Sequence, residues 1–219
     1  MNNIRFQIIF CLCIILYGCT STHVTTIWKA QHFFPMKYNN ILVVGIIKNE
    51  NDSLRRELEK NFVVDLEGLG YHAVSAVHEF GPKGLADLRG EETYIRLCNR
   101  GIDAVITIAL IDKRKEMTSK SHKATGYPGK YYYDRIWGYK NIQSEFANGY
   151  PQSGDYFWET ILFDLASLEP QSTIQTRSFN AADAERRSDE LLGHVIQKMR
   201  KEKILRRHQN KITTQRKPF

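Results

Sequence analysis

The stretch Ile41-Leu42-Val43-Val44-Gly45-Ile46-Ile47 decides the fold class. It is a continuous apolar run rich in β-branched residues, and runs of this kind form strands that are buried on both faces of a sheet. Residues 103–110 (DAVITIAL) repeat the pattern further along the chain. Two such strands predict an α/β fold in which helices cover a parallel sheet.

Helical patterns separate the predicted strands. Residues 51–53 (Asn-Asp-Ser) can cap a helix, and apolar residues then recur at helical spacing from 54 to 69. A short strand is expected over 71–77, and a second helix over 91–99. This order of elements predicts right-handed βαβ units in a parallel sheet.

The second half of the chain predicts antiparallel strands. Residues 156–165 form one strand, the turn 169–172 (Glu-Pro-Gln-Ser) follows, and residues 173–179 return beside it. Asn180 caps a final helix whose apolar stripe should lie on the sheet. The sequence therefore predicts one α/β domain over residues 36–205. It is a two-layer or three-layer sandwich with a mixed sheet, parallel in its N-terminal half and antiparallel in its C-terminal strands.

The N-terminus has the pattern of an export signal. Arg5 precedes an apolar run over residues 6–17, which is shorter than the roughly 20 residues that a membrane-spanning helix needs. The stretch Leu16-Tyr17-Gly18-Cys19 resembles the lipobox of bacterial lipoproteins, in which the matching cysteine carries diacylglycerol and the signal is cut before it.

This resemblance implies a signal peptide over residues 1–18, lipidation of Cys19, and a tether over residues 19–35 that holds the domain near its membrane. The alternative is that Cys19 is one more cysteine of an apolar leader. With the signal removed, Cys98 is the only free thiol, so no internal disulfide is expected. Its apolar neighbours predict that Cys98 is buried in a helix, and a reactive thiol is the alternative.

The net charge of +7 comes from the C-terminus. Residues 197–219 hold nine Lys or Arg residues against Glu202 alone. Residues 206–219 are predicted to be a basic disordered tail, which either aids solubility or attracts anionic lipid headgroups or envelope polymer. The predicted export argues against nucleic acid as a partner.

The sequence contains none of the common catalytic or metal-binding motifs. Gly-x-Ser-x-Gly, Ser-x-x-Lys, His-Glu-x-x-His and Cys-x-x-Cys are all missing, and the histidines are scattered. The loop 48–52 has no glycine that would let backbone N–H groups approach a phosphate. We therefore predict no catalytic residue, no metal and no cofactor. A hydrolase that uses Asp103, Asp112 or Asp164 is the least favoured interpretation, because strand ends and turns alone explain these aspartates.

Two groups of residues are candidates for binding. In a parallel sheet, ligands bind beyond the carboxyl ends of the strands where the strand order reverses. With the first three predicted strands in the order 2-1-3, that crevice is lined by four polar residues, which also fit ordinary loops: Asn49, Asn51, Asp112 and Lys113. The aromatic residues between 127 and 158 suit contact with a protein or a glycan, and core packing is the alternative. The candidates among them are Tyr131, Tyr133, Trp137, Tyr139 and Trp158.

With these pieces placed, residues 36–205 resemble a group of envelope lipoproteins of Bacteroidota-type bacteria, for which no activity is established. The resemblance rests on the strand at 41–47, on Gly-Ile-Asp-Ala-Val-Ile-Thr at 101–107, on Trp-Gly-Tyr at 137–139, and on Trp-Glu-Thr at 158–160. More loosely, the order of elements looks like the α/β modules of secretion and assembly lipoproteins.

The resemblance implies a protein of the cell envelope that is attached to a membrane by its lipid. Surface-exported lipoproteins of such bacteria tend to carry acidic residues just after the lipidated cysteine, and residues 20–23 (Thr-Ser-Thr-His) contain none, so the resemblance implies a domain that faces the periplasm. By the rule known for enterobacterial lipoproteins, Thr20 in place of an aspartate implies the outer membrane. We expect a non-enzymatic interaction or envelope-assembly protein with an envelope protein as partner. Binding of peptidoglycan or another glycan is the alternative.

Overall fold

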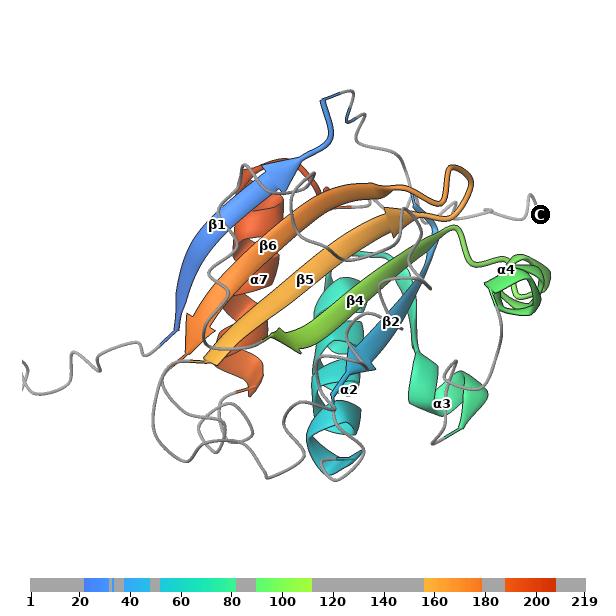
Figure 1. The fold of residues 1–219 in the computed structure, drawn as a ribbon, viewed down its shortest axis with the longest axis horizontal. Coiled ribbons are helices and arrows are strands. Elements are labelled where there is room, and N and C mark those ends of the chain that lie inside the picture. The colour runs from blue at the N-terminus through green and yellow to red at the C-terminus, as the bar shows by residue number, and fades with distance from the viewer. Residues whose placement is uncertain are drawn as a thin grey trace, which may run out of the picture.

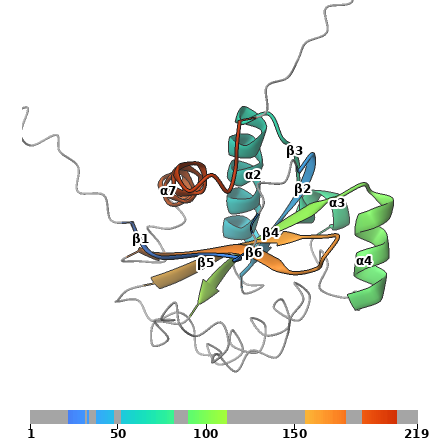
Figure 2. The same ribbon diagram turned by 90° about the horizontal axis from the view of Figure 1, so that it is seen from above.

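The computed structural model describes residues 22–31, 33, 38–47, 52–81, 90–111, 156–178 and 188–207. Within them, a six-stranded mixed sheet has helices on both of its faces (Figures 1 and 2), which confirms the predicted α/β fold. In chain order the elements are β1 (His23–Lys29), β2 (Asn40–Ile46), α2 (Asp52–Gly68), β3 (His72–Ser75), α3 (Ala76–Phe80), α4 (Gly90–Asn99), β4 (Ala104–Ile111), β5 (Tyr156–Asp164), β6 (Pro170–Ser178) and α7 (Ser188–Lys201).

The strand order across the sheet is β1-β6-β5-β4-β2-β3. Strands β3, β2 and β4 are parallel, so the first three predicted strands do lie in the order 2-1-3. Strands β5, β6 and β1 continue the sheet through antiparallel pairs, as Figure 1 shows. The predicted change from a parallel to an antiparallel half is therefore confirmed.

The continuous apolar run of β2 has a direct structural explanation. Successive side chains of a strand point to opposite faces of the sheet. Ile41 and Val43 pack on the face that α2 and α7 cover, whereas Leu42 and Val44 pack on the opposite face with Leu97 of α4. Both faces of β2 are buried from Ile41 to Ile46, and so no polar residue occurs between these positions.

Helix α2 buries one stripe of side chains against the sheet. Leu54, Leu58, Phe62 and Leu66 are at most 3% exposed. Burial of an apolar side chain of this size contributes about 1.5–3 kcal/mol, so the stripe fixes the helix on the sheet. Helix α7 buries the predicted apolar stripe on the same face of the sheet, where it packs beside α2 (Leu191, Leu192, Val195, Ile196 and Met199).

Residues 23–29 form the edge strand β1, so the predicted tether over these residues is wrong. Strand β1 pairs with β6, and Ile27 lies opposite Ile174. Val24 and Ile27 are partly buried against the core. Threonine, valine and isoleucine favour strands, and this preference outweighs the polar character that suggested a tether.

Two further boundaries differ from prediction. The strand expected over 71–77 ends at Ser75, which caps α3 by accepting the His78 N–H at its Oγ (3.2 Å). Strand β6 already begins at Pro170, so the chain reverses direction before the predicted turn at 169–172. Within the described part of the chain, no helix is both long enough and apolar enough to span a membrane.

Candidate functional site

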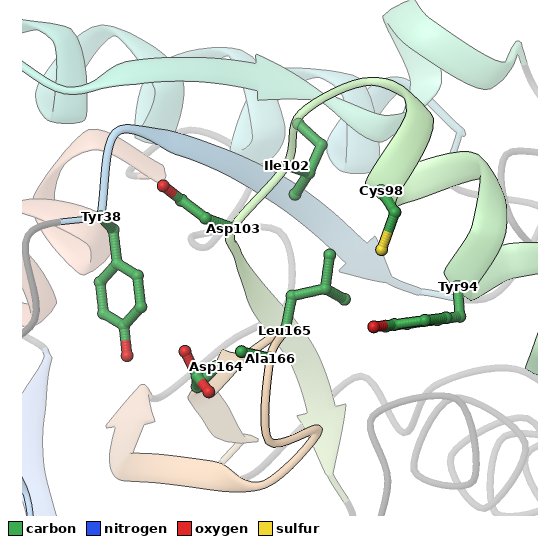
Figure 3. Close-up of a pocket in the computed structure, with 8 residues that line it drawn as sticks. All are labelled: Tyr38, Tyr94, Cys98, Ile102, Asp103, Asp164, Leu165 and Ala166. Carbon is green, nitrogen blue, oxygen red and sulfur yellow. The ribbon is translucent and has the colours of Figure 1, made fainter.

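A pocket of about 420 Å³ lies at the end of the sheet where β2 and β4 begin and β5 ends (Figure 3). Pockets of this size accommodate small molecules. We call it the Tyr38 pocket. Its lining residues come from the segment before β2, from α4, from the loop before β4, and from the end of β5 with its turn: Tyr38, Tyr94, Cys98, Ile102, Asp103, Asp164, Leu165 and Ala166.

The pairing of the central strands brings these residues together. Ala104 of β4 lies opposite both Ile41 of β2 and Asp164 of β5. The Leu165 N–H donates to the Asp103 carbonyl oxygen at 3.0 Å, which extends this pairing beyond the strands. Residues from three distant parts of the sequence therefore share one end of the sheet.

Asp103 holds the segment that precedes β2. Its Oδ2 accepts the Asn39 N–H at 2.7 Å, and its Oδ1 accepts the Asn40 N–H at 3.1 Å. The Asn40 side chain donates in turn to the Gly101 carbonyl oxygen at 2.8 Å. Burial raises the pKa of Asp103. Both of its carboxylate oxygens thus fix the backbone from which Tyr38 extends.

Asp164 shapes the turn after β5. Asp164 is 4% exposed, and its Oδ2 accepts the Ser167 N–H at 2.7 Å. Asp164 also lines the Tyr38 pocket. The two oxygens of a carboxylate offer about four lone pairs, so this side chain can accept a further hydrogen bond in the pocket.

Tyr38 has a hydroxyl group that the fold does not explain. The residue is 2% exposed, and among the described residues its hydroxyl group has no hydrogen-bond partner. Figure 3 shows the hydroxyl group pointing toward Asp164. Burial raises the pKa of Tyr38 and the nearby Asp164 and Asp103 carboxylates raise it further, so the hydroxyl stays protonated. An unpartnered buried hydroxyl costs about 1–3 kcal/mol, which marks this position as a candidate binding point.

Helix α4 supplies the other side of the pocket with Tyr94 and Cys98, which lie one helical turn apart. The hydrogen bond with the Cys98 thiol raises the pKa of Tyr94. Cys98 is exposed, so the prediction that it is buried is wrong. Leu97 faces the sheet instead and is fully buried. Cys98 is the next residue of the helix, so its side chain points about 100° away from that of Leu97.

Glu59 is a second buried acid, and its contacts explain it fully. Its Oε1 accepts the Gly45 N–H at 2.8 Å. Its Oε2 accepts the Ser75 hydroxyl at 2.5 Å and the Val77 N–H at 2.9 Å. Burial raises the pKa of Glu59. These bonds tie α2 to β2, β3 and α3, which is a structural role.

The residues that the sequence singled out for lipidation, for binding or as acids of the least favoured hydrolase interpretation are placed as follows. Asp103 and Asp164 meet in the Tyr38 pocket. Trp158 is 1% exposed and packs in the core on the α2 and α7 face, so it is not a surface contact. The other candidates lie outside the described residues: Cys19, Asn49, Asn51, Asp112, Lys113, Tyr131, Tyr133, Trp137 and Tyr139.

Tyr38 and Tyr94 were missed by the sequence analysis. Tyr38 is a single aromatic residue shortly before a buried strand, and only the pairing of β2, β4 and β5 connects it to Asp164. Among the residues that the structure describes, no group of three or more His, Cys, Asp or Glu side chains is arranged to hold a metal ion.

Comparison with known proteins yields structural neighbours only. No family model matches the chain, and no curated protein matches it. The fold is similar to the PelC dodecamer from Paraburkholderia phytofirmans, with 9% identity, a TM-score of 0.44, and coverage of 85% of this chain and 99% of that chain. A single-substitution variant of that dodecamer matches with 9% identity and a TM-score of 0.40, and the match covers 80% of this chain and 95% of that chain. At this level the similarity bears on neither the ligand nor the assembly of this chain.

Proposed function

We propose that this chain is a lipid-anchored protein of the cell envelope, attached through Cys19 at the outer membrane with its domain in the periplasm. Its domain acts by binding a ligand rather than by catalysis. The lipobox-like stretch at 16–19 motivates the anchor. Strand β1 begins at His23, only four residues after Cys19. At no more than about 3.6 Å per residue, the connection reaches roughly 14 Å. The anchor would therefore hold the start of β1 close to the membrane surface.

The observation that carries the proposal is the position of the Tyr38 pocket relative to this strand. His23 lies opposite Arg177, and Arg177 lies opposite Phe157 near the start of β5. Asp164 lies at the other end of β5. At about 3.3 Å per residue, the sheet separates the anchored end from the pocket by roughly 23 Å. A domain held at His23 would present its pocket to the periplasm.

The contacts of the two acids favour binding over catalysis. Asp103 and Asp164 hold backbone N–H groups, and so they act as rigid parts of the scaffold. A general acid or base must exchange protons during each turnover, whereas backbone N–H donors stabilise the ionised form of a carboxylate. A fixed pocket that combines a buried carboxylate with a hydroxyl group lacking a partner among the described residues is suited to recognition.

Metabolic labelling with a radioactive fatty acid tests the anchor. We expect the wild-type chain to incorporate label and to fractionate with outer membranes, and Cys19→Ser to lose both properties. Cys98→Ser is the matched control and should behave as wild type. A Cys19→Ser chain that is processed and membrane-bound like the wild type would contradict the proposal.

Fluorescence quenching in vesicles tests the orientation. The lipidated protein is labelled at Cys98, which lines the pocket, or at His23→Cys in a Cys98→Ser background, and quenchers are placed on the lipid headgroups. We expect strong quenching at position 23 and weak quenching at position 98. Equal quenching at both positions, or the reverse order, would overturn the proposed orientation.

A further inference from the structure

We infer that the Tyr38 pocket binds an organic ammonium group, the protonated primary amine of a small molecule. The inference rests on the proposed binding role of the pocket and names the class of ligand that the site accepts.

The charges of the pocket favour a cation. Of the described residues that line it, two are acidic and none is basic. The carboxylates of Asp103 and Asp164 lie close enough to interact electrostatically. Two carboxylates at one partly buried site attract positive charge and repel anions.

The hydrogen-bonding groups of the pocket match an ammonium group. Asp164 is 4% exposed and lines the pocket, and its carboxylate has lone pairs beyond the one that accepts the Ser167 N–H. The hydroxyl oxygen of Tyr38, which has no partner among the described residues, can accept another. Both groups lie on the same side of the pocket, with the hydroxyl of Tyr38 pointing toward Asp164 (Figure 3). A protonated amine has three N–H donors and can satisfy both acceptors at once.

The remaining walls suit an organic stem. Ile102, Leu165 and Ala166 line the pocket with aliphatic side chains, and Tyr94 adds an aromatic ring. A ligand that carries its charge on a short hydrocarbon stem would bury that stem against these side chains. The volume of about 420 Å³ lies within the range of small-molecule sites.

A bare metal ion fits this pocket poorly. Calcium takes six to eight oxygen ligands and magnesium takes six. Both oxygens of Asp103 and one oxygen of Asp164 already accept backbone N–H groups. An ammonium group needs only two or three acceptors, which the Asp164 carboxylate and the Tyr38 hydroxyl group can supply.

Titration of the full-length protein in neutral detergent tests the inference, with binding followed by ligand-detected NMR. The probes are n-butylamine, 1-butanol, butyrate and butyltrimethylammonium, which share one stem length. We expect n-butylamine to bind at least tenfold more tightly than 1-butanol or butyrate. Butyltrimethylammonium carries the charge but no N–H donor, and should also bind at least tenfold more weakly.

Two tyrosine variants separate the ligand site from the fold. Tyr38→Phe removes a hydroxyl without a described partner, so we expect tenfold weaker n-butylamine binding and a melting temperature that does not fall. Tyr71→Phe is the matched control, because the Tyr71 hydroxyl accepts the Arg206 N–H at 2.8 Å outside the pocket. It should lower the melting temperature and leave n-butylamine binding unchanged. Asp164→Asn retains an oxygen for the Ser167 N–H, and should weaken amine binding at least tenfold.

The outcomes separate the ammonium inference from the proposed binding role of the pocket. If 1-butanol or butyrate binds as tightly as n-butylamine and Tyr38→Phe abolishes that binding, the ammonium inference is overturned and the binding role of the pocket stands. If no probe binds, or if Tyr38→Phe leaves amine binding unchanged, the inference falls and the pocket loses its proposed role. The lipid-labelling experiment on Cys19 is independent of all these results.

Discussion

The backbone N–H of Gly45 donates to Oε1 of Glu59 at 2.8 Å, and this bond takes the place of a strand that ends too early. Strand β3 pairs with β2 only as far as Ser75, which lies opposite Val43. Two residues further on, none of the described strands lies beside β2 on that side. A buried backbone N–H without a partner is costly, and the Glu59 carboxylate from α2 removes that cost.

Replacement of Gly45 by alanine should destabilise the fold. A Cβ atom at this position would lie 2.7 Å from Arg55 Cγ and 3.3 Å from Glu59 Oε1. Side chains of α2 must therefore shift, which disturbs the bond to Glu59, and overpacking of this kind costs about 1–3 kcal/mol. Urea denaturation measures the change in the free energy of unfolding.

Gly193→Ala is the matched control for Gly45→Ala. Among the described residues, and apart from the neighbouring residues and backbone of helix α7 itself, no atom lies within 4 Å of a Cβ at position 193, so alanine should stabilise the helix by about 0.5–1 kcal/mol. Equal effects of the two substitutions would show that the contact between α2 and β2 is looser than described.

The stability of the wild-type chain relative to Glu59→Gln should depend on pH. Burial raises the pKa of Glu59 in the folded state, so protonation of this side chain favours folding. The contribution of Glu59 is largest below the ordinary glutamate pKa of 4.5, and is lost as the pH rises through the folded-state pKa. Glutamine does not titrate.

Urea denaturation at several pH values from 4.5 to neutral checks this prediction. The difference in unfolding free energy, wild type minus Glu59→Gln, should rise as the pH falls. A difference that is constant with pH, or that falls as the pH falls, would mean that the hydrogen bonds of Glu59 outweigh its burial.

The central elements could be predicted because their sequence patterns come from local geometry. Strand β2 is buried on both faces and contains only apolar residues and Gly45 between positions 41 and 46. Strand β1 could not be predicted in the same way. It lies at an edge, and its stability depends on pairing with β6, which is far away in the sequence. Helix α3 was also missed, because the Glu59 contacts at Ser75 and Val77 stop β3 there.

The candidate site was harder to predict than the fold. Asp103 and Asp164 were recognised as residues at strand ends, but the register of three strands was needed to place them together. The decisive feature of Tyr38 is a hydroxyl group without a described partner. That feature depends on the atoms around it, and no spacing or composition in the sequence records it.

Cys98 should react readily with thiol reagents in the folded protein. The side chain is exposed on α4, so a reagent can reach it without unfolding. Reaction with Ellman's reagent, in a chain with Ser at positions 11, 13 and 19, measures the rate. We expect a rate within about tenfold of that in 8 M urea, since access no longer limits the reaction. Strong protection in the folded state would indicate that the Cys98 side of the pocket is covered.

Lys203→Gly should stabilise the C-terminal end of α7. Lys203 has φ 60, a backbone conformation that is unfavourable for residues with a Cβ atom. The Ile204 N–H donates to the Met199 carbonyl oxygen at 2.8 Å, the same connection that Ile102 makes to Leu97 at 3.0 Å after α4. There the equivalent residue is Gly101, with φ 67. Glycine at 203 keeps the hydrogen bonds and removes the steric cost, a gain of about 1 kcal/mol.

Thermal unfolding of Lys203→Gly, compared with Lys203→Gln, checks this prediction. Both substitutions remove the positive charge, but glutamine keeps the Cβ atom in the strained conformation. Only Lys203→Gly should raise the melting temperature, whereas Gly101→Ala should lower it by the reverse argument. If Lys203→Gln stabilises the chain as much as Lys203→Gly, the gain comes from relief of repulsion among the basic residues of the helix end. The left-handed conformation would then contribute nothing measurable.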